Sequence, residues 1–278
     1  MIWSNAKRAL VIGAVTLLTG VIATLAVRAI IHARQQATAA RRRADLARWK
    51  TQVWPEERKL EIERIQSRQA VDDTVNAAII DLSPYINAKL TDAPAGWKGD
   101  NADNLAELPA GKNIYGGVPF DVEGSIQLMG GWFKHYHKTY PARVDDIRIG
   151  RHCAKLHLLQ GNCYITYTNF GTVVSKLVLH YVDGSSRQID LIAGKQAFDW
   201  WNPLFKTGLP KNWFQPAPGT ERAWTGSNAY LKKWQPEFSL VLYKTTLDNP
   251  QPKLELSSLD YVSTETITCP FLVGLTVE

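Results

Sequence analysis

Hydrophobic residues near the N-terminus form one long uninterrupted run. Ala9–Val27 contains nineteen consecutive residues without a charged side chain. As a helix that rises about 1.5 Å per residue, this run spans roughly 29 Å, close to the thickness of a bilayer's hydrocarbon core. Basic residues stand on both sides of it, as they do around membrane-spanning helices: Lys7, Arg8, Arg28 and Arg34. The pattern predicts a single transmembrane anchor over residues 9–32, after a short tail at residues 1–8.

Two alternatives for this run are a cleaved signal peptide and a buried helix of a soluble domain. A signal peptide has a shorter apolar core, with small residues at a cleavage site soon after it. Here the run is followed instead by Arg28, Ala29, Ile30, Ile31 and His32. A buried helix would not need the flanking basic residues, so we expect an uncleaved anchor.

Residues 33–78 show a helical pattern. From Gln35 to Ala78 the segment lacks glycine and is rich in Ala, Arg, Glu, Gln and Leu, which favour helix. Apolar residues recur at helical spacing on both sides of Pro55: Leu46, Trp49 and Val53, then Leu60, Ile62, Ile65, Val71, Val75 and Ile79. The repeat is too short and irregular for a coiled coil. We expect a helical juxtamembrane stalk.

Residues 79–278 have a strand pattern. Val173–Val182 alternates in polarity and is followed by an Asp183-Gly184 turn and a returning run, which predicts a hairpin. Ten short runs separated by turn residues predict strands: Val118–Val122, Ser125–Leu128, Asp146–Ile149, Lys155–Leu159, Tyr164–Thr168, Val173–Val182, Gln188–Ile192, Ser239–Tyr243, Leu254–Val262 and Phe271–Val277. Such a series, without intervening helices, predicts a mainly β domain that is an antiparallel sandwich or barrel.

A set of motifs spans the same region: Ile80–Tyr85 (IDLSPY), Leu105–Gly111 (LAELPAG), Gly117–Leu128 (GVPFDVEGSIQL), Ile149–Leu159 (IGRHCAKLHLL), His180–Gly184 (HYVDG), Asp199–Trp201 (DWW), Asn249–Pro252 (NPQP) and Pro270–Glu278 (PFLVGLTVE). Together these motifs resemble a domain at the C-termini of membrane-anchored and multidomain bacterial proteins. That family is similar to galactose-binding-like, non-catalytic carbohydrate-binding domains. The resemblance implies a jelly-roll β-sandwich. This chain departs from the family's usual motif at Glu123, where the family has arginine.

The net charge of +6 is concentrated beside the predicted anchor. Basic residues there suit contact with anionic lipid headgroups, so nucleic acid is a poor candidate partner. Their position after the anchor would retain the C-terminal domain in the cytoplasm by the positive-inside rule. The short N-terminal tail, typical of a signal anchor, and the family resemblance favour the opposite placement. We expect a single-pass protein of the cell membrane with an extracytoplasmic C-terminal domain.

Tryptophans gather in one polar and proline-rich segment. Five of them, Trp200, Trp201, Trp213, Trp224 and Trp234, lie within thirty-five residues. Sugars present flat C–H faces that stack on indoles and hydroxyls that need amide or guanidinium partners. A core role is the alternative, above all for the two tryptophans of the matched Asp199–Trp201 motif. The predicted ligand-binding residues are Trp200, Trp201, Trp213, Trp224, Asn228 and Arg222.

Metal and catalytic motifs are weak. His135, His137 and His152 lack the further ligands of a zinc site. Asp121, Glu123 and Asp260 offer oxygen ligands that suit calcium, but without an EF-hand spacing. No P-loop, G-x-G-x-x-G or G-x-S-x-G motif is present. We therefore expect no cofactor, no metal and no enzymatic activity.

The three cysteines do not identify a compartment. A hairpin of Lys155–Leu159 with Cys163–Thr168, turning at Gln160-Gly161-Asn162, would hold Cys153 and Cys163 about 20 Å apart. That separation forbids a disulfide between them. Cys269 could pair with either of the other two cysteines, depending on the geometry of the fold.

Two functions fit these observations. The first is a membrane-anchored, non-catalytic protein that binds carbohydrate or a cell-envelope polymer through its tryptophans. The second is a protein-interaction or signalling module held on a helical stalk, because tryptophan is also enriched at protein interfaces.

Overall fold

The computed structural model describes residues 78–93, 102–135, 137–203 and 215–278. All of them belong to one compact unit, Ile62–Glu278. The predicted tail, anchor and stalk lie outside the described residues, except for Ala78, which belongs to a strand. Within the described ranges, no helix is long and apolar enough to cross a membrane.

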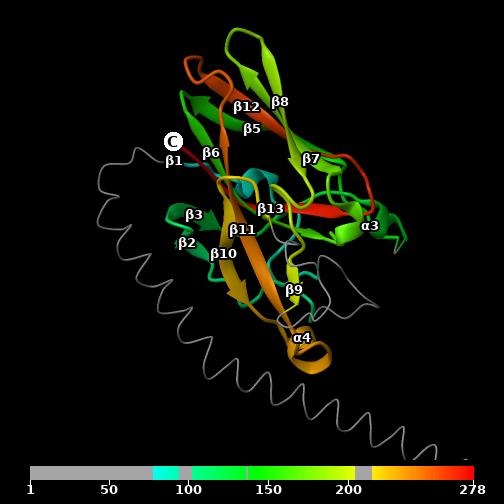
Figure 1. The fold of residues 1–278 in the computed structure, drawn as a ribbon. Helices are drawn as coiled ribbons and strands as arrows, with labels where there is room; N and C mark the ends of the chain where they lie inside the picture. The colour runs from blue at the N-terminus through cyan, green and yellow to red at the C-terminus, as the bar shows by residue number, and fades with distance from the viewer. Residues whose placement is uncertain (1–77, 94–101, 136, 204–214) are drawn as a thin grey trace, which may run out of the picture. The chain divides into compact units, whose positions relative to one another are not determined.

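The described part is mainly β, as the sequence predicted, and its strands are antiparallel (Figure 1). The largest sheet has the order β1-β13-β6-β11-β10, with β4 also paired to β13 and β9 to β11. These strands are β1 (Ala78–Ile79), β4 (Ile126–Gln127), β6 (Lys155–Cys163), β9 (Trp201–Pro203), β10 (Thr220–Gly226), β11 (Phe238–Asp248) and β13 (Cys269–Val277).

A second sheet has four strands in the order β5-β12-β7-β8. They are β5 (Arg143–Arg151), β7 (Val173–Tyr181), β8 (Ser186–Ile192) and β12 (Leu256–Ser263). The hairpin predicted around Asp183-Gly184 is the β7–β8 pair. A third, two-stranded sheet consists of β2 (Gly111–Tyr115) and β3 (Val118–Val122).

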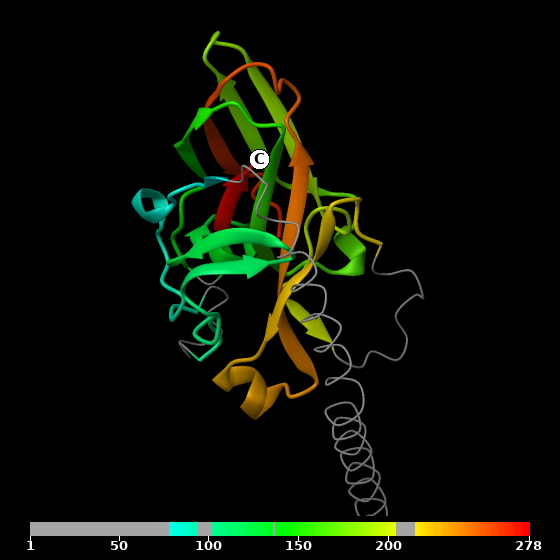
Figure 2. The same cartoon turned by 90° about the vertical axis from the view of Figure 1, so that its left-hand side faces the viewer.

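The described residues also form two short α-helices, α3 (Gly131–His135) and α4 (Ala229–Trp234). Asn228 caps α4, because its side-chain oxygen accepts a hydrogen bond from the backbone N–H of Leu231. Figures 1 and 2 both show α4 at one end of the β10–β11 pair, near β9. This helix therefore brings its side chains to the end of the largest sheet.

Strands β6 and β13 carry apolar residues on both faces. One face contributes Leu158 and Leu275 to a first core cluster, together with Leu177 of β7 and Leu259 of β12. The other face contributes Leu159, Phe271 and Val273 to a second core cluster, which also contains Phe120, Phe133, Trp200, Leu231 and Leu242. Every residue of β13 is buried. The two strands therefore lie between two apolar cores.

The predicted turn at Gln160-Gly161-Asn162 is wrong, because these residues continue β6. Gln160 is buried but donates its side-chain N–H groups to the Gln196 carbonyl and to Thr245 Oγ1. Gly161 faces Phe271, and a Cβ at this glycine would lie 2.4 Å from the ring. Glycine here serves close packing between neighbouring strands rather than a turn.

The other predicted strands coincide with strands of the structure, except Tyr164–Thr168. That segment turns away from β6 and leads into a 3₁₀ helix at Tyr167–Asn169. Thr166 and Asn169 form a capping box there. The side chains of Thr166 and Asn169 thus satisfy backbone N–H groups of this turn, where the sequence predicted a strand.

Candidate functional site

Trp200 is a core residue. It is 2% exposed, and its ring meets Phe271 edge-on at a centroid distance of 5.8 Å. Its backbone N–H donates to the carbonyl of Asn162 over 2.8 Å, which fixes the chain beside β6. The indole of Trp200 therefore packs inside the second core cluster and does not form a surface for a ligand.

Trp201 is half-buried and lies at the edge of that cluster. Its indole Nε1–H donates to Oδ1 of Asp103 over 3.2 Å. Two further rings lie beside it, Tyr230 of α4 and Phe238 of β11, each at a centroid distance of 5.7 Å. The indole thus has a fixed orientation, set by one carboxylate and two aromatic side chains.

Asn228 belongs to the same polar contact. Its Nδ2 donates to Asp103 Oδ1 over 2.9 Å and to the Asn104 carbonyl over 3.1 Å. Asp103 therefore joins two residues that the sequence predicted as ligand-binding, Trp201 and Asn228. Asp103 is 1% exposed. The sequence gives no sign of this carboxylate's role, because nothing local in the chain links Asp103 to residues 98 and 125 positions away.

Trp224 shares a sheet face with Trp201. A Cβ at Gly226 would lie 2.3 Å from the Trp224 ring, so this indole covers Gly226. Gly226 pairs with Leu240, and Leu240 pairs on its other side with Trp201. Because paired residues project to the same face of a sheet, both indoles lie on the face of the second core cluster. Trp224 is half-buried, like Trp201.

Arg222 lies on the opposite face. A register shift between Arg222 and Trp224 places Arg222 beside Tyr243, one residue from the partner of Trp224. Its guanidinium donates to Asn202 Oδ1 over 3.4 Å. The structure thus gathers Trp201, Trp224 and Asn228 but not Arg222. Trp213 lies outside the described residues.

The carboxyl group of Asp199 organises the backbone beside this site. Its two oxygens accept hydrogen bonds from the backbone N–H groups of Ile165 and Trp201, over 2.8 and 2.7 Å. The residue as a whole is half-buried, but its carboxyl group is desolvated. Desolvation raises the pKa of Asp199 to about 7, although these backbone hydrogen bonds act in the opposite direction. The segment after β6 is thereby tied to Trp201.

We define the Trp201 site as Asp103, Trp201, Trp224, Asn228 and Tyr230. Beyond it, Trp234 at the end of α4 is 57% exposed, and Lys233 Nζ lies 4.6 Å from its ring centroid. Half-buried and exposed aromatic side chains thus occur along α4, in Tyr230 and Trp234. The site offers indole and phenol rings for stacking, with a buried carboxylate and amide that hold Trp201 in place.

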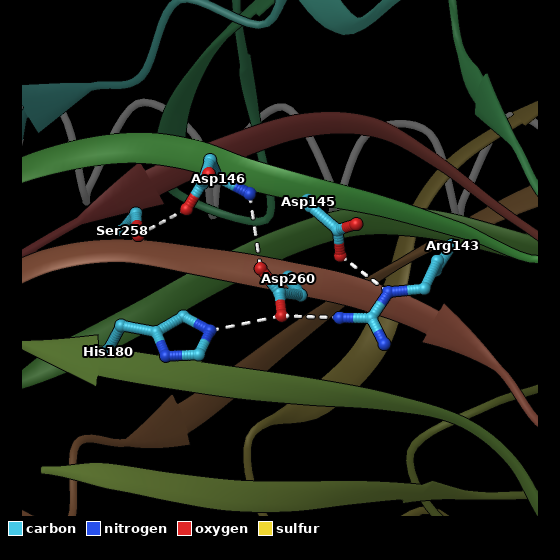
Figure 3. Close-up of polar contacts among 6 residues, drawn as sticks. All are labelled: Arg143, Asp145, Asp146, His180, Ser258 and Asp260. Carbon is cyan, nitrogen blue, oxygen red and sulfur yellow. Dashed lines mark hydrogen bonds and ion pairs between the residues drawn. The ribbon is translucent and has the colours of Figure 1, made fainter.

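A separate polar cluster lies on the four-stranded sheet (Figure 3). Asp260 Oδ2 accepts from Arg143 over 2.8 Å and contacts His180 Nε2 at 3.0 Å, while Oδ1 accepts from the backbone N–H of Asp146. Burial raises the pKa of Asp260, but the hydrogen bonds from His180 and Asp146 and the charges of His180 and Arg143 outweigh it and lower the pKa overall. Asp260 therefore acts as the anionic centre of a cross-strand network.

The contacts of Asp260 argue against a calcium site formed with Asp121 and Glu123. The oxygens of Asp260 already contact cationic and N–H donors, whereas Asp121 and Glu123 lie in or just after β3, in another sheet. Among the residues that the structure describes, no group of three or more His, Cys, Asp or Glu side chains is placed to hold a metal ion. His135 ends α3 beside Trp132 at 6.0 Å, and His152 follows β5.

Comparison with known proteins finds no match to this chain among protein-family models, curated proteins or solved structures.

Proposed function

We propose that this chain is a single-pass, membrane-anchored protein that displays a non-catalytic jelly-roll β-sandwich and binds carbohydrate or another cell-envelope polymer at the Trp201 site. The anchor is residues 9–32, the stalk 33–78 and the displayed domain 79–278. The galactose-binding-like resemblance remains part of this proposal.

Strand order supports the jelly-roll assignment. Eight strands, β4 to β8 and β11 to β13, follow one another along the chain, apart from the inserted β9 and β10. Numbered one to eight, they are ordered 1-8-3-6 in the largest sheet and 2-7-4-5 in the four-stranded sheet. Strands of both sheets contribute to the first core cluster. In each sheet, strands from the two ends of this series lie beside strands from its middle. That order is the one expected of a jelly roll, which consists of two Greek keys in two packed sheets.

The observation that carries the binding proposal is the hydrogen bond from Trp201 Nε1 to the buried Asp103. It holds an indole at the edge of a core instead of leaving it to pack freely. Trp224 lies on the same sheet face, and Tyr230 stands beside Trp201. Rigid aromatic rings beside polar groups suit the alternating apolar faces and hydroxyl edges of a sugar ring.

The test is a binding measurement with the full-length chain in detergent micelles against a panel of purified envelope polysaccharides. We expect at least one to bind and to remain the same length after prolonged incubation. Trp224→Ala should weaken binding about 5- to 150-fold, which corresponds to roughly 1–3 kcal/mol for one large apolar side chain. Trp213→Ala tests whether the segment after β9 contributes as well.

Arg222→Ala is the matched control, because Arg222 lies on the same strand as Trp224 but on the other face of the sheet. It should leave the affinity within about twofold. If folded Trp201→Ala and Trp224→Ala variants bind as well as the wild type, the Trp201 site is not the binding site. If no polysaccharide binds and a protein partner co-purifies, the chain is an interaction module. Shortening of the polysaccharide with time would identify an enzyme.

A further inference from the structure

Two buried cysteines face each other on neighbouring strands of the largest sheet. Cys163 is the last residue of β6, and Cys269 is the first residue of β13. The antiparallel register pairs them directly, and both side chains belong to the second core cluster. Both are free thiols in the structure. Neither takes part in the Trp201 site.

The hydrogen bonds of the neighbouring pair define their spacing. The carbonyl of Asn162 accepts a hydrogen bond from the N–H of Trp200, and the carbonyl of Pro270 accepts one from the N–H of Leu128. Both carbonyls therefore point away from the boundary between β6 and β13. Because hydrogen-bonded and non-hydrogen-bonded pairs alternate along antiparallel strands, Cys163 and Cys269 form a hydrogen-bonded pair, with Cα atoms about 5.5 Å apart. Disulfides join cysteines with Cα separations of roughly 4.4–6.8 Å.

Cys153 is not an alternative partner for Cys163. The predicted hairpin between them is wrong, but the conclusion drawn from it stands for another reason: Cys163 ends β6, whereas Cys153 lies just before the start of the same strand. The extended chain from Lys155 to Cys163 alone spans about 26 Å. Cys153 instead packs at the far end of β6, where Asn249 Nδ2 donates to its carbonyl over 2.8 Å.

We propose that Cys163 and Cys269 become joined by a cross-strand disulfide when the chain folds in an oxidising compartment. The oxidant is a disulfide donor, either a small-molecule disulfide or the active disulfide of a thiol oxidoreductase. The thiolate of one cysteine attacks a donor sulfur and releases the first donor thiol. The second cysteine, as its thiolate, attacks this mixed disulfide and releases the other donor thiol. Two cysteine thiols are oxidised, and one donor disulfide is reduced to two thiols.

Burial places this reaction during folding rather than after it. Cys163 is 1% exposed and Cys269 0% exposed, so a donor does not reach them in the folded chain. Burial also raises the pKa of Cys269 to about 12, although N–H groups of α3 act against this, and burial raises the pKa of Cys163 well above its usual value. Thiolates, which are the attacking species, are therefore scarce once the core has formed.

The test uses the full-length chain synthesised by cell-free translation in detergent, in one reaction with glutathione disulfide and in another with dithiothreitol. Both reactions are quenched with acid, and the chain is denatured, alkylated with N-ethylmaleimide, digested and analysed by mass spectrometry. From the oxidising reaction we expect a peptide pair linked through Cys163 and Cys269, with Cys153 alkylated. From the reducing reaction all three cysteines should be alkylated.

Cys153→Ala is the matched control and should keep the linked pair. Cys163→Ala should abolish it and leave Cys269 alkylated, a readout made on denatured chain that does not depend on how well the variant folds. Three alkylated cysteines from both reactions would overturn the proposal. So would a linked pair that contains Cys153 in protein with a native circular dichroism spectrum.

Discussion

Trp201 donates its indole N–H to Asp103, a residue 98 positions earlier in the chain, over 3.2 Å. The same carboxylate oxygen accepts a hydrogen bond from Asn228, over 2.9 Å. One buried oxygen thus joins the segment before β2, strand β9 and the first turn of α4. The arrangement of the Trp201 site depends on this oxygen as much as on the tryptophans themselves.

Replacing Asp103 should therefore destabilise the protein. Asp103→Ala removes the oxygen that accepts from Trp201 Nε1–H and Asn228 Nδ2–H. The loss should lower the free energy of unfolding by about 1–3 kcal/mol, the cost of leaving a buried polar group without its partner. Chemical denaturation of the full-length chain, followed by tryptophan fluorescence, measures the change. Asp248→Ala, at the exposed end of β11, is the control and should stay within roughly 0.5 kcal/mol of wild type. Equal stability of the two variants would contradict a structural role for Asp103.

Stability should fall in acid through Asp260. Its pKa is lowered in the folded chain, so it holds a proton less tightly there than in the unfolded chain, where its pKa is about 3.9. The stability that ionised Asp260 contributes is therefore complete above the unfolded pKa and is lost as pH falls through the folded pKa. Melting temperatures from pH 6 to pH 2 should drop less steeply for Asp260→Asn than for wild type. Asp248→Asn should follow the wild-type profile, and a wild-type slope in Asp260→Asn would refute the role of this network.

Asp199 should act in the opposite direction and at higher pH. Its folded pKa of about 7 lies above the unfolded value of about 3.9. The folded chain holds this proton more tightly, so the stability it contributes is present below pH ~4 and is lost as pH rises to about 7. Asp199→Asn should flatten the melting temperature between pH 4 and pH 8. The slope is the readout, because a carboxamide also accepts fewer backbone hydrogen bonds. An unchanged slope would show that Asp199 ionises without penalty.

The proposed topology predicts protease sensitivity from outside the cell. If residues 9–32 are an anchor and residues 79–278 lie outside the cytoplasm, protease added to spheroplasts should digest the domain while a cytoplasmic marker stays intact. An epitope tag after Glu278 reports the loss. Digestion only after lysis would place the domain in the cytoplasm, as the basic residues after the anchor would favour.

Sequence analysis predicted the strands whose polarity alternates and whose turns are local. Val173–Val182 is such a case, because each alternate side chain faces a core and Asp183-Gly184 reverses the chain. It failed at Gln160-Gly161-Asn162, where turn-forming residues lie inside a central strand. The amide of Gln160 finds its acceptors in the Gln196 loop and in β11, and Gly161 makes room for Phe271. Both reasons are tertiary and leave no local signal.

The same limit applies to the candidate site. Trp200 and Trp201 are adjacent and of one residue type, yet one lies in a core and the other at its edge. A register shift in β10 separates Arg222 from Trp224 by sheet face. Asp103 is brought in from a distant segment. The residue types therefore indicate which side chains could bind a ligand, whereas the strand register determines which of these side chains lie together.

Strand β5 is an edge of the four-stranded sheet, and its backbone is irregular. Its pairing with β12 shifts register twice, and Asp146 and Gly150 have positive φ angles of 55° and 61°. Asp145, Asp146, Arg148 and Arg151 are all exposed along it. A straight, apolar edge invites another strand to add to the sheet, whereas kinks and charges oppose such addition. The kinks and exposed charges of β5 therefore make this edge a poor template for aggregation, even where many copies of the protein are crowded together.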